Sequence, residues 1–469
     1  MNRTAECFDL IVVGAGMAGH CAALEAAHLG GSVLLLEKTA QYGGSTRMCG
    51  GAFAFAGTAI QKEHGIEDSA ELLEEDLLKA GKYRNDRALV RTYAERQFEN
   101  YQWLKQLGLA FEQVSLSGSQ SVPRNHSISP VKVLDTLHAH YLAAGGSYRA
   151  NSQVTGLLTE GKAGACTVTG VQLVDGGVIL ARGGVVITTG GFSRSADLVE
   201  RFVPHLRAAL PMGGYGNTGD GLKMAWALGA DLVDIGYVKG SFGAPVRAKD
   251  GPEDLDAPRL LSAMYKGAIV VNRLGRRFVN ESISYKAIGD ECLLQPDAVA
   301  FQIFDQQVMD QSSPLPTVSD YKAGLAAGVV VKAPSIAALA DLLGIDACAL
   351  NATVERYHQA CDGHAEDEFG RTSLSTGYGK PRKLLEGPFY GVACTTGLTS
   401  TYCGLRTDPK ARVLNVAGNV ITGLYASGEV MGGFHGETYM SGSSLAKGCI
   451  FGRLAAQDAV GRAKHAGVR

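Results

Sequence analysis

A glycine-rich turn near the start of the sequence has the spacing of a phosphate-binding loop. The apolar residues 10–13 lead directly into Gly14-Ala15-Gly16-Met17-Ala18-Gly19. In such a turn the first glycine permits a tight bend, the second lets the backbone approach a pyrophosphate, and the third lets the next helix pack against the strand. The free N–H groups and the dipole at the start of that helix favour negative charge. The turn therefore predicts a dinucleotide site.

An acid and a second glycine-rich loop distinguish between the possible dinucleotides. Glu37 ends the second apolar run, where a carboxylate accepts hydrogen bonds from an adenosine ribose and disfavours a 2′-phosphate. A glycine-rich loop follows at 38–51, and a third contact region, Gly428-Glu429, lies near the other end of the chain. A cofactor contacted from both ends of the sequence, across an inserted region, is more naturally FAD than NAD. The sequence predicts FAD.

The composition restricts the class of protein. The 469 residues include 44 Lys and Arg against 46 Asp and Glu, so there is no basic excess for binding nucleic acid. We see no apolar run approaching the ~18 residues of a membrane span. The ten cysteines are scattered without a C-x-x-C pair, and we expect no metal. Reduced thiols in a cytoplasmic protein are the favoured interpretation.

Taken in order, these pieces resemble the fumarate reductase/succinate dehydrogenase flavoprotein superfamily, in particular its soluble branch with flavocytochrome-type fumarate reductases and 3-ketosteroid dehydrogenases. The matching stretches are GAGMAG with Glu37, GGSTRMCGG (43–51), TTGGF (188–192), NTGDG (217–221), RFVNES (277–282), GPFYGVA (387–393) and residues 426–453. The resemblance implies an α/β fold, in which a Rossmann-like FAD-binding domain with a parallel sheet is split by an inserted α+β cap domain and the active site lies between the two. We expect the FAD-binding domain at 1–235 and 396–469, and the cap at 236–395.

The resemblance also implies contacts to FAD. Glu37 would hold the adenosine ribose and Glu429 the ribityl chain, while the backbone at Ser444-Leu445 would face the flavin N1/O2 edge, where a helix N-terminus stabilises negative charge. Relatives with covalent FAD use a histidine in the loop after the second strand, and residues 43–51 contain none. We therefore expect non-covalent FAD. The predicted contacts are Gly14, Gly16, Met17, Ala18, Gly19, Glu37, Lys38, Gly43, Gly44, Ser45, Thr46, Gly50, Gly51, Thr189, Gly190, Gly191, Asp220, Gly428, Glu429, Ser444 and Leu445.

Four positions depart from the dicarboxylate-binding pattern of the fumarate reductases. The cap arginine falls at Tyr285 in RFVNESISY, and the C-terminal substrate arginine falls at Tyr439 in HGETYMSG. The two histidine positions fall near Ser241 and Ser400. Because all four ligands are replaced, we expect neither fumarate nor succinate as the substrate.

The replacements match the 3-ketosteroid dehydrogenase pattern instead. Those enzymes have a tyrosine at the position of Tyr285, and a C-terminal tyrosine and a glycine N–H, matched by Tyr439 and Gly442, that bind the substrate ketone. In the implied mechanism Tyr439 and Gly442 stabilise an enolate-like oxygen. Tyr285, as phenolate, removes the α-proton, and the β-hydrogen leaves as a hydride to flavin N5. A free tyrosine titrates near pH 10, so a neighbouring cation or hydrogen-bond donor must favour the phenolate, with Lys286 and Arg276 as candidates.

Other residues near these motifs carry weaker signals. We assign His435 to the substrate pocket, with capping of the glycine loop as the alternative, and Tyr402 to a pocket wall beside Ser400. Arg124 and His126 could recognise an acidic substituent, but solvated loop residues are the favoured interpretation. The acidic residues 366–368 are expected to form a solvated face.

The leading hypothesis is an FAD enzyme that desaturates a small-molecule ketone between its α and β carbons, with an unidentified electron acceptor. The first alternative is the reverse reaction, an ene-reductase of an α,β-unsaturated carbonyl compound or acid like the urocanate reductases. A flavin-binding redox sensor or structural protein is the non-enzymatic alternative. We see no C-x-x-C-H haem motif in the sequence, which favours oxidation. The ketone, steroid or small ring, and the oligomeric state stay open.

A limited set of elements must position these residues. We expect helices at 87–106 and 131–144, strands within 152–187, and a helix at 222–228 with Thr218 and Asp220 as cap residues. A strand at 420–425 and a final helix at 444–459 complete the predicted FAD-binding domain. Glycine makes up 61 of the 469 residues, which indicates many tight turns.

Overall fold

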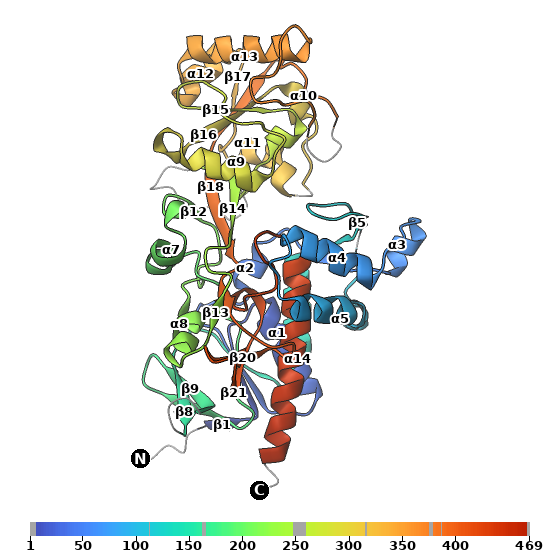
Figure 1. Cartoon of the computed structure of the whole chain (residues 1–469), viewed down its shortest axis with the longest axis vertical. Coiled ribbons are helices and arrows are strands. Elements are labelled where there is room, and N and C mark those ends of the chain that lie inside the picture. Colours follow the sequence, from blue (N-terminus) through green and yellow to red (C-terminus); the bar gives the residue numbers. More distant parts are fainter. Residues whose placement is uncertain are drawn as a thin grey trace. The chain divides into compact units, whose positions relative to one another are not determined.

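The computed structural model describes residues 6–111, 113–161, 166–246, 259–314, 317–374, 379–385 and 387–466. The chain divides into two compact units (Figure 1). The first comprises Met1–Pro204, Gly213–Lys239 and Ser400–Arg469, and the second His205–Met212 and Gly240–Thr399. The sequence placed the limits of the inserted domain at 236 and 395. It did not anticipate the segment His205–Met212, whose strand β12 (Leu210–Pro211) pairs with β18 (Phe389–Thr401).

The first unit alternates strands and helices. Its strands are β1 (Glu6–Phe8), β2 (Leu10–Val13), β3 (Val33–Leu36), β4 (Ala52–Ala54), β5 (Gln113–Ser115), β6 (Asn125–Ser127), β7 (Ser147–Arg149), β8 (Val154–Glu160), β9 (Thr167–Leu173), β10 (Val178–Ala181), β11 (Val185–Ile187), β13 (Leu232–Val233), β19 (Gly404–Leu405), β20 (Arg412–Leu414) and β21 (Val420–Ala426). Its helices are α1 (Met17–His28), α2 (Gly44–Arg47), α3 (Ala59–Glu63), α4 (Ala70–Ala80), α5 (Arg87–Gln106), α6 (Pro130–Ala143), α7 (Ala196–Phe202), α8 (Asp220–Ala227), η6 (Gly428–Val430) and α14 (Ser443–Ala466).

A mixed sheet forms the centre of this unit. In the described part of the chain ten strands take part, in the order β1-β10-β9-β21-β11-β2-β3-β7, with β20 beside β21 and β8 beside β9. The pairs that join β21, β11, β2, β3 and β7 are all parallel. Every residue of β2, β3 and β11 is buried, as expected of strands covered on both faces. The α/β prediction is confirmed.

The strand register brings the ends of four parallel strands to one edge of the sheet. Val13 of β2 lies opposite Leu36 of β3 and Ile187 of β11, and Ile187 lies opposite Ala426 of β21. In open α/β sheets, ligands bind outside the carboxyl ends of the strands. The segments that follow these four residues, 14–19, 37–39, 188–191 and 427–429, therefore meet at the edge where a nucleotide would bind.

The first and last helices pack against each other beside this sheet (Figure 1). A Cβ atom at Gly452 of α14 would lie 2.6 Å from the carbonyl oxygen of Ala18 in α1, so glycine permits the close approach. Farther along the two helices, Arg453 Nε donates to Glu25 Oε2 at 2.7 Å, and both side chains are 9% exposed. Helix α14 thus contacts α1 near both of its ends, at Ala18 and at Glu25.

The second unit is an α+β fold around a separate sheet, with strand order β12-β18-β16-β15 and with β14 and β17 also paired to β18. Its elements are β14 (Val238–Pro245), η2 (Ala263–Lys266), β15 (Ile269–Asn272), α9 (Tyr285–Leu293), η3 (Pro296–Ala298), β16 (Ala300–Phe304), α10 (Gln306–Met309), η4 (Thr317–Ser319), α11 (Tyr321–Ala326), β17 (Val331–Ala333), α12 (Ile336–Leu343), α13 (Ala347–Cys361) and β18, with η1 (Pro204–Leu206) at its start. Two apolar clusters cover the sheet, one around Phe304 and Tyr390 and the other around Leu339 and Tyr357.

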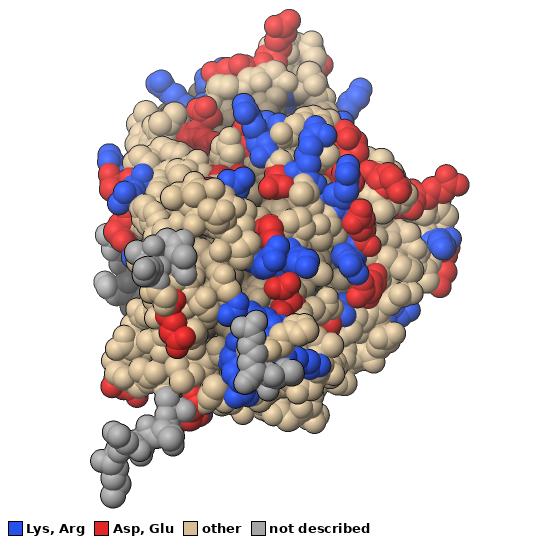
Figure 2. Space-filling model, turned by 60° about the horizontal axis from the view of Figure 1, so that its bottom comes forward, with Lys and Arg blue, Asp and Glu red and all other residues tan. Residues whose placement is uncertain are grey.

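Two further features of the described residues concern membrane spans and surface charge. Among them no helix combines the length and the apolar character that a membrane span requires. Figure 2 shows basic and acidic side chains interspersed on one face of the molecule.

Candidate functional site

The glycines of the first turn meet different steric demands. Gly14 has φ +106°, and a Cβ atom there would lie 2.6 Å from the carbonyl oxygen of Thr188. A Cβ at Gly19 would lie 1.9 Å from the carbonyl oxygen of Gly14. At Gly16, however, the nearest atom would be 3.6 Å away, so the fold itself has room for a methyl group there. Glycine at this position fits the close approach of a phosphate.

The second glycine-rich loop is fixed to the first turn by hydrogen bonds. Helix α1 begins after Gly16 without a side-chain cap, and Met17 N donates to Thr46 Oγ1 at 3.1 Å. Gly43 N donates to the carbonyl oxygen of Ala15 at 2.8 Å. Ser45 Oγ accepts from Gly214 N at 2.9 Å. Residues 43–46 therefore border the N-terminus of α1, where an anion is stabilised.

Glu37 is held at the carboxyl end of β3 and is 9% exposed. Its Oε2 accepts from Ala15 N at 3.0 Å, and its Oε1 accepts from both the backbone N and the hydroxyl of Thr39 at 2.9 Å. These three donors orient the carboxylate beside the glycine turn, where the sequence placed the ribose.

Lys38 and Asp220 come together from distant parts of the sequence. The Lys38 ammonium lies 2.8 Å from Asp220 Oδ2 and 2.6 Å from Thr218 Oγ1. The predicted capping of α8 by Thr218 and Asp220 is wrong, because Gly219, at φ +76°, is the N-cap and no side chain caps the helix. Burial alone raises the pKa of Asp220, but the hydrogen bonds from Lys38 and Thr218 outweigh it and hold this pKa below its ordinary value.

Glu429 lies among the other predicted FAD contacts at this edge. Its Oε1 accepts from Thr401 N at 2.8 Å, and Asn217 Nδ2 lies 3.3 Å from each carboxylate oxygen. Burial raises the pKa of Glu429 above its ordinary value. A Cβ at Gly191 would lie 2.5 Å from Glu429 Oε1, which explains the glycine, and a Cβ at Gly190 would collide with Asn217. Asn217 was not among the predicted site residues, although its side chain donates to this carboxylate.

A group of aromatic residues lies beside the N-terminus of α14. The ring centroids of Tyr402 and Tyr439 are 6.5 Å apart with nearly parallel planes, and His435 lies 5.1 Å from Tyr402 and 5.4 Å from Tyr439. Ser444 Oγ lies 3.5 Å from His435 Nε2. Lys239 Nζ lies over the ring of Tyr439, 4.1 Å from its centroid. We call Tyr402, His435, Tyr439 and Lys239 the aromatic cluster.

His435 is a neutral imidazole in this cluster. It is 7% exposed, and burial, together with the charges of Lys447 and Lys239, lowers its pKa well below the ordinary value. Lys447 Nζ donates to the carbonyl oxygen of Met431 at 2.7 Å, and burial lowers its pKa to about 8. A neutral imidazole can donate one hydrogen bond and accept another.

Contacts from three other segments hold the loop that carries Tyr439. Thr438 Oγ1 donates to the carbonyl oxygen of Ala80 at 3.2 Å, and Ser441 N donates to that of Gly118 at 3.0 Å. The carbonyl oxygen of Gly442 accepts from Ala54 N at 2.9 Å, and Gly442 has φ +82°. These hydrogen bonds therefore fix the loop within the first unit. The loop leads directly into α14, and Ser444 and Leu445 lie in the first turn of that helix.

In the second unit, Tyr285 is the first residue of α9. The preceding Ser284 caps the helix, accepting from Ala287 N at 3.2 Å. Burial raises the pKa of Tyr285 to about 12, so the phenol is protonated at neutral pH. Burial therefore favours the protonated phenol over the phenolate, and the role of Tyr285 as a base stays a prediction. Lys286, one proposed source of the stabilising charge, pairs with Asp290 at 2.9 Å, and the other, Arg276, does not offset the effect of burial.

The two positions that replace the histidines belong to different units. Ser241, in the second unit, is 3% exposed, and its Oγ lies 3.4 Å from Thr399 Oγ1 of the same unit. Ser400 belongs to the first unit, and its hydroxyl donates toward Glu429. Their assignment to a substrate pocket stays a prediction.

The interpretation of Arg124 and His126 as solvated loop residues is wrong, because both are fully buried. The Arg124 guanidinium makes two hydrogen bonds to Asp68, at 2.7 and 3.0 Å, and also pairs with Asp76. His126 Nε2 lies 2.8 Å from Thr58 Oγ1. These residues fasten β6 to α4 and α3, and their donors serve the fold.

The acidic residues 366–368 are also more structured than expected. Glu366 and Glu368 are exposed, but Asp367 accepts from the Arg277 guanidinium at 2.6 Å and from Arg371 N at 2.9 Å. The prediction of a solvated face is therefore wrong for Asp367, which forms an ion pair with Arg277 within the second unit.

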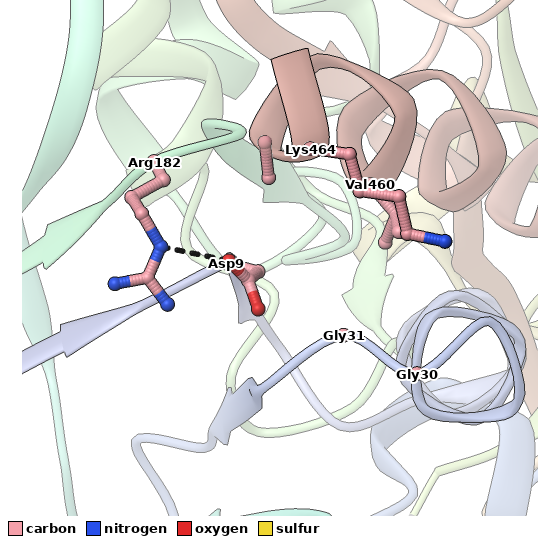
Figure 3. A pocket seen from close by; sticks show the side chains of 7 residues that line it. Asp9, Gly30, Gly31, Arg182, Val460 and Lys464 are labelled. Atoms are coloured by element: carbon pink, nitrogen blue, oxygen red, sulfur yellow. Dashed lines mark hydrogen bonds and ion pairs between the residues drawn. The ribbon is translucent and has the colours of Figure 1, made fainter. Parts of the chain in front are cut away.

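A hollow of about 300 Å³ lies at the opposite ends of α1 and α14 from the glycine turn (Figure 3). Gly30 and Gly31 follow the last turn of α1 there, and Arg182 donates to Asp9 at 2.8 Å. Lys464 Nζ donates to the carbonyl oxygen of Leu29. Both cations thus have protein acceptors, and the hollow lies away from the carboxyl edge of the sheet.

Residues 9–445 match the protein family described as FAD binding domain. The chain belongs to this FAD-binding family. The flavoprotein is 32% identical over 459 residues to a fumarate reductase (cytochrome) of Shewanella frigidimarina, which covers 96% of this chain and 76% of that protein. More distant relatives include a vinyl phenol reductase, a urocanate reductase and an NADH:acrylate oxidoreductase.

Two solved structures extend the comparison. The open conformation of a flavocytochrome c3 fumarate reductase has a TM-score of 0.86 and 30% identity, covering 98% of this flavoprotein and 79% of that chain. A 3-ketosteroid-Δ4-(5α)-dehydrogenase from Rhodococcus jostii RHA1 has a TM-score of 0.73 and 25% identity, covering 98% of each chain. The predicted superfamily and the FAD cofactor are confirmed, and the flavoprotein is an oxidoreductase that acts on CH–CH bonds.

The space and the polar groups at the edge of the sheet are consistent with bound FAD. Gly16 leaves room beside the N-terminus of α1, and a Cβ at Gly50 would meet no atom within 4 Å. The hydroxyl of Thr189 is buried without a hydrogen-bond partner among the described residues, so it offers a donor and an acceptor. With Glu37 and Glu429 placed as described, the residues predicted to contact the phosphates, the ribose and the ribityl chain lie along one edge of the sheet, and their individual roles stay predictions.

Proposed function

We propose that this flavoprotein reduces a carbon–carbon double bond conjugated to the carbonyl group of a ketone or acid. The aromatic cluster is the observation that carries the proposal. It presents phenols, a neutral imidazole and a lysine at the start of α14, whereas the fumarate reductase pattern requires arginines and histidines for two carboxylates. This set is suited to a substrate with a single carbonyl or carboxyl group.

Tyr439 binds the carbonyl oxygen in this proposal. Its hydroxyl donates a hydrogen bond to an oxygen that gains negative, enolate-like charge as the β-carbon of the conjugated double bond accepts a hydride, and Gly442 N–H is the second donor. Donors fixed before the reaction stabilise such charge more than water does, because they need no reorganisation. The loop contacts at Ala80, Gly118 and Ala54 provide that fixed position.

Tyr285 supplies the proton to the α-carbon. Its raised pKa, about 12, keeps the phenol protonated, which suits a proton donor and disfavours a base. The proposal gives the second unit the role of a cap that brings Tyr285 to the substrate. FAD, when bound, supplies the hydride.

Desaturation of a ketone, the leading hypothesis from the sequence, is the second candidate. The 25% identity and end-to-end coverage with a ketosteroid dehydrogenase favour it, and the same tyrosines serve both directions. The two directions need opposite protonation states of Tyr285, however. Reduction should be independent of pH between 7 and 9, whereas desaturation should accelerate by about tenfold per pH unit as the phenolate population grows.

The test is anaerobic turnover with reduced methyl viologen as electron donor. We expect reduction of cyclohex-2-enone or 3-phenylprop-2-enoate and no reduction of fumarate. Tyr285→Phe should slow turnover by about 10²–10⁴-fold, the usual scale for loss of a general acid, with substrate binding unchanged.

Tyr265→Phe is the matched control, since the Tyr265 hydroxyl donates to the carbonyl oxygen of Ile283 in the same unit. Fumarate as the best substrate, or full activity in Tyr285→Phe, would overturn the proposal.

A further inference from the structure

We infer that Lys239 binds the carboxylate of the substrate, so that the substrate class is an α,β-unsaturated monocarboxylate. This inference rests on the proposed function and narrows it, since the activating carbonyl becomes the carboxyl group itself. The sequence analysis did not single out Lys239.

The Lys239 ammonium lies against the face of the Tyr439 ring. Lys239 is the second residue of β14, and its Nζ lies 4.1 Å from the centroid of the Tyr439 ring. Cation–π contacts fall within about 6 Å of a ring centroid, so the ammonium sits firmly over this face. The side chain is partly exposed and can therefore reach a ligand.

The charge of Lys239 also acts on residues from two other segments. Burial is the main cause of the low pKa of His435, and the charge of Lys239 lowers that pKa further. Burial raises the pKa of the Cys49 thiol, and Lys239 acts in the opposite direction. The contact with the Tyr439 ring places the ammonium beside the loop at 431–442, and these residues all belong to the first unit.

The other ammonium near His435 has a different role. Lys447 is 2% exposed, it donates to the carbonyl oxygen of Met431, and the charges of Asp234 and Glu429 stabilise it. The Lys447 ammonium thus balances the charges of these two carboxylates inside the first unit. Lys239 is the lysine of the aromatic cluster that a ligand can reach.

The chemistry of the pair determines the substrate class. The Lys239 ammonium and the Tyr439 hydroxyl can each donate a hydrogen bond to a carboxylate. The bond from the ammonium is charge-assisted. One cation balances one carboxylate, whereas a dicarboxylate needs two. When a hydride reaches the β-carbon of an unsaturated acid, the carboxyl group gains a second negative charge, and the Lys239 ammonium stabilises this charge more than the neutral donors do alone.

Two substrates with one skeleton test the inference: 3-phenylprop-2-enoate and its methyl ketone, 4-phenylbut-3-en-2-one. With the holoenzyme and reduced methyl viologen, we expect Lys239→Met to lower kcat/KM for the acid by about 10²-fold and for the ketone by less than about threefold. Lys239→Arg should restore part of the activity toward the acid. Lys223→Met is the matched control, because Lys223 pairs with Asp197 on the surface.

A binding measurement separates this inference from the proposed function. Calorimetric titration with 3-phenylpropanoate should give a dissociation constant at least tenfold higher for Lys239→Met than for the wild type, while 3-phenylpropanamide should bind both proteins equally.

If the wild type reduces neither substrate but shows this difference in binding, the proposed function fails and the anion site stands. Equal losses for acid and ketone, or equal binding of the acid by both proteins, overturn the role of Lys239.

Discussion

The ammonium of Lys38 lies 2.8 Å from the carboxylate of Asp220 and joins the loop after β3 to the first residue of α8. The two residues are 182 positions apart in the sequence. Their side chains are 24% and 25% exposed, so the pair is partly shielded from solvent. It holds two of the segments that form the FAD edge of the sheet.

Asp220→Asn should weaken this pairing and lower the affinity for FAD by about three- to tenfold, on the order of 1 kcal/mol. Equilibrium dialysis of FAD against the apoprotein measures the change. Asp197→Asn, which removes a surface pair, is the control and should leave the affinity unchanged. An unaltered affinity in Asp220→Asn would show that the pair plays no part in holding the cofactor.

Two glycine substitutions should separate folding from cofactor binding. Gly19→Ala places a methyl group 1.9 Å from the carbonyl oxygen of Gly14, so we expect loss of FAD and a destabilisation of several kcal/mol. Gly50→Ala meets no atom within 4 Å, so the thermal midpoint of the apoprotein should stay within about 1–2 °C while FAD binding weakens. Gly50→Ala with normal FAD affinity would remove Gly50 from the predicted contacts.

The mode of FAD attachment follows from the loop at 43–51, which contains no histidine. Acid precipitation should release all the yellow colour into the supernatant, where absorbance identifies free FAD. Glu37→Ala should lower the FAD content, because the carboxylate at the end of β3 is lost. Colour that stays with the precipitated polypeptide would contradict the non-covalent assignment.

Asp234 should make stability depend on pH. Burial raises its pKa to about 6, even though its Oδ2 accepts from Gly433 N at 2.8 Å. Because the folded pKa exceeds that of the unfolded chain, its stabilising contribution is present below about pH 4 and is lost as the pH rises to about 6, by about 2–3 kcal/mol.

Asp234→Asn keeps the acceptor and should remove this dependence, so its thermal midpoint relative to the wild type should rise between pH 4 and pH 7. Parallel pH profiles for the two proteins would refute the assignment.

The elements that could be predicted are those with a strong local signal. Continuous apolar runs predicted β2 and β3, and helix α5 spans the predicted residues because Asp86 caps it and its apolar residues recur with the helical period. The glycine turn was predictable because strand, turn, helix and acid follow each other within about 30 residues.

The errors share one cause, which is a partner far away in the sequence. Asp220 looked like a helix cap because its partner, Lys38, lies in another segment. Arg124 looked solvated because Asp68 and Asp76 come from helices and loops well before it. Lys239 gave no signal at all, since a single lysine at the start of a strand has no pattern until the loop at 431–442 folds beside it.

The place of β21 in the sheet affects how the protein is made. This strand lies between β9 and β11, yet it is translated after the whole second unit. Until it is made, β11 presents an open edge and α1 lacks its partner α14, whereas β9 is already paired with β8 and β10. Open edges of apolar strands are prone to wrong pairing. The edge of the sheet where FAD is predicted to bind can therefore close only after both units have been made, although three of its four strands come from the first 190 residues.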